Sequence, residues 1–397
     1  MKKIIVFLII AVITTIKVSA LELAPYYNYQ LGQGVSVSPE GDLGFLVNLS
    51  KDIGAIASPW ENQSIMGYYS MQYQGPGLKQ QEGREFRERY LNHVFVSRHH
   101  WDLGDMTLKT QIGILMERRR SGTNETWASG LYNFNRYGGH TSLEKKILEI
   151  DSTVSLGYHY VTFPNYTDML AEIRAGADAS GTAGTQNHHS LRVSYTGNIQ
   201  PLKFWLSLNP LFFTRQKVAS DKVQKDGSFY SDTRQREIII NTGASYRESL
   251  TQKIEIVPEL DITFRFSNQN YQHFMDMTST SPVSFHEGFF NYIEPSISLP
   301  LSISLSRDLT YFFSPRMNFR FYTSRNPRDK DGSFIDDEKQ NRILGVYTTG
   351  FRKQTGESSA TTLFFTYQNQ SSNMNFERYL PYNYSGISLG LRFQMEY

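Results

Sequence analysis

A two-residue alternation of apolar and polar side chains runs along almost the whole of this chain. In the segment 254–266, one face carries Ile254, Ile256, Pro258, Leu260, Ile262, Phe264 and Phe266. The other face carries mostly charged or polar residues, among them Glu255, Glu259, Asp261 and Arg265. Successive side chains of a β-strand point to opposite sides, so each such segment predicts an amphipathic strand. Helical spacing is scarce after residue 20, and the sequence therefore predicts an all-β fold.

The predicted strands are long, at about 9–13 residues, whereas strands in soluble sheets typically have about 5–6. A strand that crosses a bilayer at a tilt needs about 9–11 residues. This length favours a transmembrane antiparallel up-and-down β-barrel over a soluble sandwich or propeller. We predict sixteen strands near 22–30, 42–50, 64–74, 90–101, 106–117, 128–137, 147–161, 188–197, 203–214, 234–247, 253–266, 287–299, 310–322, 340–352, 359–369 and 384–397.

The connections between these strands alternate in length. Those after odd-numbered strands are mostly long and polar, such as 162–187, and those after even-numbered strands are mostly short, with 51–63 and 300–309 as exceptions. Such alternation is typical of a barrel with long loops outside and short turns on the periplasmic side. An even count places both termini at the periplasmic rim. Because 90–101 and 128–137 alternate weakly, a barrel of fourteen strands is the alternative.

The first twenty residues have the features of a targeting segment. Lys2 and Lys3 precede the apolar run 4–13, and Val18-Ser19-Ala20 provides small residues before Leu21. This pattern predicts a cleaved secretory signal peptide over 1–20 and a mature barrel over 21–397. An uncleaved N-terminal anchor is the alternative, although a ten-residue run is shorter than the roughly 20 residues that a spanning helix needs. The absence of cysteine excludes disulfides, cysteine-based metal sites and a cysteine-linked lipid.

The last strand alternates apolar residues up to the final position, with Leu391, Phe393, Met395 and Tyr397 on one face. This ending resembles the terminal signal of Gram-negative outer-membrane proteins. Together with the signal peptide and the strand pattern, it places the chain with the outer-membrane β-barrel (porin-like) superfamily, without a specific family. The resemblance implies a location in the cell outer membrane and recognition of the C-terminal strand by the β-barrel assembly machinery.

The alternation of side chains between the two faces of each predicted strand also indicates which charged side chains face the interior of such a barrel. The predicted basic pore-lining residues are Lys109, Arg192, Arg316, Arg320, Arg342 and Arg392. The predicted acidic ones are Glu149, Asp151, Glu255, Glu259, Asp261 and Glu294. Opposed charges across a narrow aqueous pore would create a transverse field that favours small polar solutes over lipophilic ones. Alternatively, these charges pair with their neighbours and only keep the interior wet.

These observations predict a porin-like channel for passive diffusion of small hydrophilic solutes, with no enzymatic activity, cofactor or metal. Expected partners are outer-membrane lipid, lipopolysaccharide and small polar solutes, with a homotrimer as a further possibility. Arg118, Arg119 and Arg120 would suit lipopolysaccharide phosphates at the outer rim. The near-balance of 40 basic and 38 acidic residues gives no sign of nucleic-acid binding. No plug-like segment precedes the first strand, so we expect no energy-coupled receptor.

Two alternatives belong to other functional classes. One is a structural or adhesive surface barrel whose long loops bind partners. The other is a lipid hydrolase, because Asn187-His188-His189-Ser190 resembles a stretch of the outer-membrane phospholipases in which a histidine activates a serine. Leu191 and Val193 mark the lipid-facing side of this strand, so parity turns His188 and Ser190 toward the interior, away from a lipid substrate.

Overall fold

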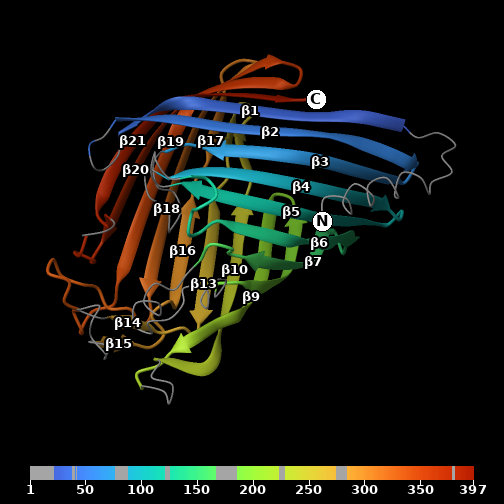
Figure 1. Cartoon of the computed structure of the whole chain (residues 1–397). Helices are drawn as coiled ribbons and strands as arrows, with labels where there is room; N and C mark the ends of the chain where they lie inside the picture. Colours follow the sequence, from blue (N-terminus) through green and yellow to red (C-terminus); the bar gives the residue numbers. More distant parts are fainter. Residues whose placement is uncertain are drawn as a thin grey trace.

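The chain folds into one closed antiparallel β-barrel (Figure 1). The computed structural model describes residues 22–37, 41, 43–76, 88–120, 126–166, 186–222, 229–273, 284–377 and 381–397. The predicted signal peptide, residues 1–20, lies outside these ranges. Within them, no helix is both long and apolar enough to cross a bilayer.

Sixteen strands form the barrel, as predicted. The first eight are β1 (Glu22–Val37), β2 (Leu43–Trp60), β3 (Gln63–Gln74), β4 (Arg89–Asp102), β5 (Met106–Arg120), β6 (Phe134–Ile147), β7 (Ile150–Thr162) and β8 (His188–Ile199). The other eight are β9 (Leu202–Ala219), β10 (Tyr230–Tyr246), β13 (Glu259–Ser267), β16 (Tyr292–Ser298), β18 (Leu309–Tyr322), β19 (Asn341–Gly356), β20 (Ser359–Ser372) and β21 (Tyr384–Glu396).

Five shorter strands complete the fold. Three of them continue barrel strands past an irregularity: β11 (Glu248–Thr251) extends β10, β12 (Ile254–Ile256) leads into β13, and β17 (Leu301–Ser304) extends β16. The remaining two, β14 (Tyr271–His273) and β15 (Ser284–His286), pair with each other in a separate two-stranded sheet. This small sheet lies in the connection between β13 and β16.

The barrel closes where its first strand meets its last. β1 pairs with β2 along one edge and with β21 along the other, from Asn28 opposite Glu396 to Val37 opposite Ile387. The backbones of Tyr27 and Tyr397 also exchange two hydrogen bonds of 2.8 and 2.7 Å. Closure leaves no open sheet edge between β1 and β21, so the backbone groups there are satisfied within the protein, as a bilayer interior requires.

The two rims differ as the alternating connection lengths predict. Seven connections at one rim have two to four residues, and two of them lie where the sequence suggested longer segments. β2 and β3 join through residues 61–62, and β17 and β18 through 305–308, because these strands extend further than their alternation indicated. The opposite rim carries the long connections, including 163–187, 268–291 and 323–340.

One predicted strand is wrong. The sequence suggested a strand over 128–137, but residues 127–129 and 131–132 form turns and β6 spans Phe134–Ile147. The Asn133 side chain, 1% exposed, holds these turns by accepting a 2.6 Å hydrogen bond from the Arg119 backbone N–H and donating one of 2.8 Å to the Trp127 carbonyl. The connection to β7 is then the two-residue turn Leu148-Glu149, in which both residues have positive φ.

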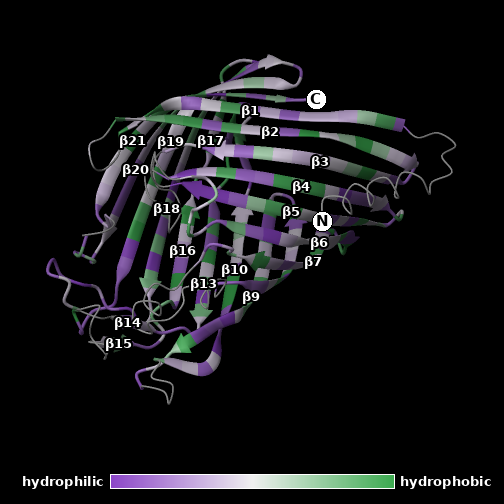
Figure 2. Cartoon of the chain, viewed as in Figure 1, coloured by the Kyte–Doolittle hydropathy of each residue, from purple (hydrophilic) through white to green (hydrophobic). Residues whose placement is uncertain are grey.

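Apolar and polar residues alternate along the barrel strands (Figure 2), and the large exposed apolar side chains lie on the outer face. Leu363 and Phe365 on β20 and Leu389 and Leu391 on β21 point outward, each at least 40% exposed. Inward positions carry side chains such as Thr366 and Gln368. In a membrane barrel the lipid replaces a hydrophobic core, so the large apolar residues belong on the outside.

Candidate functional site

The inward face of the barrel gathers nearly all of the charged residues that the sequence singled out. On the predicted basic side, Arg192 lies on β8, Arg316 and Arg320 on β18, Arg342 on β19 and Arg392 on β21, each at an inward position of its strand. Lys109 is inward on β5, where its Nζ is 2.7 Å from a carboxylate oxygen of Glu144.

The predicted acidic residues are placed less uniformly. Glu255, Glu259, Asp261 and Glu294 lie inward on β12, β13 and β16, and Asp151 lies inward near the short-turn end of β7. Glu149 instead occupies the Leu148-Glu149 turn, where its carboxylate pairs with Lys146 Nζ at 2.9 Å and its side chain is 85% exposed. This glutamate therefore belongs to the rim and not to the interior surface.

Several of these charges neutralise one another locally. Glu294 accepts a hydrogen bond from Arg320 Nε and lies 3.2 Å from Arg342 Nη2, so one carboxylate on β16 is shared by guanidinium groups of the next two strands. Arg247 pairs with Glu255 at 3.5 Å. The structure thus brings Arg320 and Arg342 together with a carboxylate that the sequence assigned to a separate acidic side.

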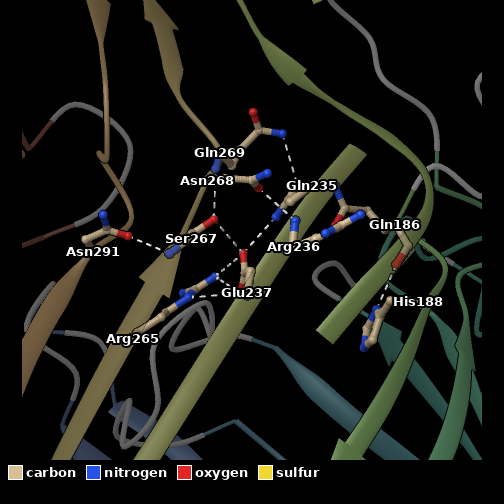
Figure 3. Close-up of polar contacts among 10 residues, drawn as sticks. All are labelled: Gln186, His188, Gln235, Arg236, Glu237, Arg265, Ser267, Asn268, Gln269 and Asn291. Carbon is tan, nitrogen blue, oxygen red and sulfur yellow. Dashed lines mark hydrogen bonds and ion pairs between the residues drawn. The ribbon is translucent and has the colours of Figure 1, made fainter. Parts of the chain in front are cut away.

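A second buried ion pair was missed by the sequence analysis (Figure 3). Glu237 on β10 is only 3% exposed, and Arg265 on β13 donates to both of its carboxylate oxygens at 2.9–3.1 Å. Gln235 Nε2 and Ser267 Oγ donate to the same carboxylate at 2.7 and 3.3 Å. A carboxylate with this many donors is fully satisfied, so the cluster acts as a structural junction and leaves little room for a ligand.

A different part of the interior has accessible basic groups. Arg98 on β4, Arg136 and His140 on β6, His159 on β7 and Arg192 on β8 all point inward, and we call these five residues the β4–β8 basic surface. Arg98, Arg136, His140 and Arg192 are exposed, and His159 is half-buried. Within the described part of the chain, none of the five forms an ion pair with a carboxylate.

Of this surface, the sequence predicted only Arg192 as a pore-lining residue. Arg98 lies on 90–101, which alternates weakly, and Arg136 and His140 lie on the strand that was misplaced. His159 lies on the polar face of the predicted strand 147–161. The weak alternation has a local cause, because His93 occupies an outward position on β4 and its Nδ1 is 2.7 Å from the Tyr69 hydroxyl on β3. A polar residue on the outward face interrupts the apolar–polar alternation from which the inward face of the strand is predicted.

Next to this surface lies a cavity of about 300 Å³ on the inner side of β8, β9, β10 and β13. Arg192, Lys203 and Glu259 contribute charge to its lining, and Trp205 contributes an aromatic ring. Trp205 is fixed by its Nε1–H, which donates to Asn241 Oδ1 at 3.0 Å and to Asp261 Oδ1 at 3.3 Å. One basic and one acidic residue that the sequence predicted to line the pore, Arg192 and Glu259, therefore line the same cavity.

The residues that resemble the phospholipase stretch do not form a catalytic pair in the described structure. His188 and Ser190 point inward, since their strand neighbours Leu191 and Val193 are exposed on the outer face. Ser190 Oγ donates to Asn209 Oδ1 at 2.8 Å, whereas His188 Nδ1 lies 2.9 Å from the Gln186 carbonyl. Among the residues described, no group of three or more His, Cys, Asp or Glu side chains is arranged to hold a metal ion.

Comparison with known proteins finds similarity of fold and none of sequence. No protein-family model and no curated protein matches the chain. OmpTdeltaL8, a loop-deletion mutant of an outer-membrane protein of Vibrio cholerae, has a TM-score of 0.47 and 10% identity, over 95% of this chain and 100% of that one. CdiB from Acinetobacter baumannii has a TM-score of 0.48 and 10% identity, over 95% of this chain and 66% of that one.

A porin mutant of Rh. blastica has a TM-score of 0.38 and 10% identity, over 95% of this chain and 100% of that one. A closed sixteen-stranded barrel with an apolar outside, a polar inside and unequal rims is the architecture expected of a membrane-spanning β-barrel, and this chain has that fold.

Proposed function

We propose that this outer-membrane β-barrel protein is a passive, water-filled channel for small hydrophilic solutes. The observation that carries the proposal is the accessibility of charged side chains on the inner face, where Arg98 and Arg192 remain exposed. Ionised groups without a nearby counter-charge need water around them. Barrels of sixteen strands are wide enough to leave an aqueous channel, whereas eight-stranded ones fill with side chains.

The buried ion pairs support the same proposal. Glu237 with Arg265, and Glu294 with Arg320 and Arg342, fix side chains against the inner surface of β10–β19. Long side chains that are held in this way do not extend across the interior. The proposed channel needs no cofactor, metal or catalytic residue, and we propose no enzymatic activity.

The proposal is tested by single-channel recordings from the folded protein in a planar bilayer. Stable conductance steps are expected, together with an ion selectivity that shifts when Glu259→Gln removes a carboxylate from the lumen cavity. Lys51→Gln is the matched control, because Lys51 lies on the outward face of β2 with the exposed Ile53 and its charge does not face the interior. Absence of conductance from folded barrels would contradict the proposal and favour an adhesive or structural role.

Contacts at the rim suggest how the barrel sits in its membrane. β5 extends to Arg120, and Arg118 and Arg120 occupy its outward face, whereas Arg119 points inward and pairs with Glu117 at 2.8 Å. We propose that Arg118 and Arg120 contact lipopolysaccharide phosphates from the long-loop rim. We also propose that β21, which carries Phe393 and Met395, together with Tyr397 after it, is the segment recognised by the β-barrel assembly machinery. Trimer formation remains a prediction from the sequence.

A further inference from the structure

Strand register places the β4–β8 basic surface in one compact region of the inner face. Arg98 is opposite Gln111, Gln111 opposite His140, His140 opposite Gly157 and Gly157 opposite Arg192, so three basic side chains share one row across five strands. His159 lies in the neighbouring row and Arg136 in the one beyond. Neighbouring strands lie about 4.8 Å apart, so successive basic residues of this row, which are two strands apart, are separated by about 10 Å along the sheet.

This region lacks carboxylates. A row here means the residues that lie directly opposite one another from β4 to β8. Asp and Glu are absent from the four inward rows that begin at Val94, Val96, Arg98 and His100 on β4. The nearest inward carboxylates on these strands are Glu117, which pairs with Arg119, and Glu144, which pairs with Lys109. The five basic groups therefore act together on whatever enters the lumen beside them.

Small residues open the surface between the basic side chains. Gly157 separates His140 from Arg192, and a Cβ at this position would lie 3.3 Å from His140 Cβ and 3.8 Å from Arg192 Cβ. Gly113 and Gly138 occupy the row on one side. The row on the other side runs from His100 and Lys109 through Ser142, Ser155, Ser194 and Ser207. Guanidinium and imidazole donors therefore project from a floor of small residues beside a strip of hydroxyl groups, and we call this part of the surface the recess.

Arg98 is held in place by neighbouring side chains. Arg98 Nε donates to Gln111 Oε1 at 2.7 Å, and its guanidinium lies 5.1 Å from the centre of the Tyr68 ring. Arg192 lines the adjacent 300 Å³ cavity, so the recess is continuous with space for the remainder of a solute. Guanidinium groups bind carboxylate and phosphate through paired hydrogen bonds, and hydroxyl groups donate to the same oxygens.

We propose that the β4–β8 basic surface is an oxyanion-binding site in the lumen, which makes the channel prefer small solutes that carry phosphate or carboxylate. This inference rests on the proposed channel function and names its solute class. The site slows such solutes beside Arg98, His140 and Arg192 without trapping them, because each guanidinium stays exposed to water and weak contacts allow release.

The test uses the folded full-length barrel and inorganic phosphate as the probe. Phosphate affinity is measured by titration calorimetry in detergent, and channel block by phosphate is measured in a planar bilayer against chloride at equal ionic strength. We expect phosphate to bind and to reduce the chloride current, and the double variant Arg98→Gln/Arg192→Gln to weaken both effects by about tenfold or more, since each substitution removes charge-assisted hydrogen bonds.

Two charge-matched variants separate this site from a general effect of net charge. Arg352→Gln removes an inward charge from β19, and Lys51→Gln removes an outward charge from β2; both should retain the phosphate affinity of the unmodified protein. Ser155→Asp places a carboxylate in the serine row and should abolish phosphate binding with little change in volume. It also provides the test if the double arginine variant does not fold.

The outcomes distinguish the two proposals. Conductance without phosphate binding, or equal phosphate affinity in the unmodified protein and in Ser155→Asp, would overturn the oxyanion site and leave the channel standing. Phosphate binding that Ser155→Asp abolishes, in a barrel without conductance, would support the site and overturn the channel.

Discussion

Arg265 donates from Nε and Nη2 to both carboxylate oxygens of Glu237, and so joins β13 to β10 near the end of the barrel that carries the long connections. Glu237 is almost completely buried, whereas the Arg265 side chain keeps 27% of its surface exposed. Gln235, which also donates to Glu237, accepts a 2.9 Å hydrogen bond from Gln269 Nε2, and Ser267 N–H donates to Asn291 Oδ1 at 2.6 Å. One ion pair thus connects two barrel strands to the start of the connection that contains β14 and β15.

Removal of this arginine should destabilise the barrel. In Arg265→Met the Glu237 carboxylate stays buried without its counter-charge, a change that costs about 3–5 kcal/mol in fully buried pairs. Because Arg265 retains contact with water, we expect about 2 kcal/mol here. The measurement is urea-induced unfolding of the barrel in detergent or lipid, followed by tryptophan fluorescence.

Lys217→Met is the control for that experiment. Lys217 pairs with Asp232 at 3.3 Å, but the Asp232 side chain is fully exposed, and exposed pairs contribute about 0–1 kcal/mol. Its unfolding midpoint should match that of the unmodified protein. Equal midpoints for Arg265→Met and Lys217→Met would show that the buried pair has no special role in stability.

Substitution of Glu294 should change selectivity. Arg320 and Arg342 both contact this carboxylate, so Glu294→Gln removes a negative charge that two inward guanidinium groups share. The lumen becomes more positive, and the zero-current potential in a KCl gradient should shift toward anion preference. Glu149→Gln removes the same charge from the exposed 148–149 turn and should cause a smaller shift. A larger shift from Glu149→Gln would place the selective region at the short-turn rim instead.

Protonation of His286 should loosen the small β14–β15 sheet. Burial lowers the pKa of His286, and Arg328 and Lys339 lower it further, whereas Asp336 acts in the opposite direction. Its ring lies 4.2 Å from the centre of the Phe334 ring, and its buried Nε2 has no hydrogen-bond partner among the described residues. A group whose pKa is lower in the folded state binds fewer protons there, so stability falls as the pH drops below the unfolded value of about 6.5.

Hydrogen exchange of the 271–273 and 284–286 amides at pH 7.5 and pH 5 tests this expectation. In the unmodified protein, protection of these amides should decrease on acidification relative to the amides of β20, after correction for intrinsic exchange rates. His286→Phe keeps the ring and removes the titration, so its protection should be independent of pH. An equal pH dependence in both proteins would assign the effect to another group.

The sequence predicts on which face of a strand a residue lies better than it predicts which residues of other strands it contacts. Along 254–266, alternation alone places Glu259, Asp261 and Arg265 inward and Phe264 and Phe266 outward, because a strand has only two faces. Alternation cannot show that Arg265 meets Glu237, which is 28 residues away. That contact depends on the register between β10 and β13, and hence on turn lengths and on the stagger of the whole barrel.

Glycine explains the error in the placement of β6. Gly138 and Gly139 fall in the connection between the predicted strands 128–137 and 147–161, yet both residues lie within β6. A Cβ at Gly138 would lie 2.1 Å from the Tyr158 carbonyl oxygen, and a Cβ at Gly139 would lie 2.0 Å from the Gln111 carbonyl oxygen. Glycine here permits close approach of three strands and does not mark a turn. Arg136 and His140 were missed because of this displaced strand, and Arg98 was missed because His93 interrupts the alternation of β4.

The same geometry makes Gly138 a position where a single methyl group should prevent folding. Gly138 has φ +148°, and a Cβ would also lie 2.8 Å from His159 Cα, which is backbone and cannot move aside without breaking the β6–β7 ladder. We expect Gly138→Ala to reduce strongly the yield of folded barrel on refolding into detergent, measured by far-UV circular dichroism and resistance to protease. Gly67→Ala is the matched control on β3, since nothing lies within 4 Å of a Cβ there, and it should refold like the unmodified protein. If Gly138→Ala refolded as well as Gly67→Ala, β6 and β7 would have to be further apart, and His140 and His159 would not share the recess with Arg192.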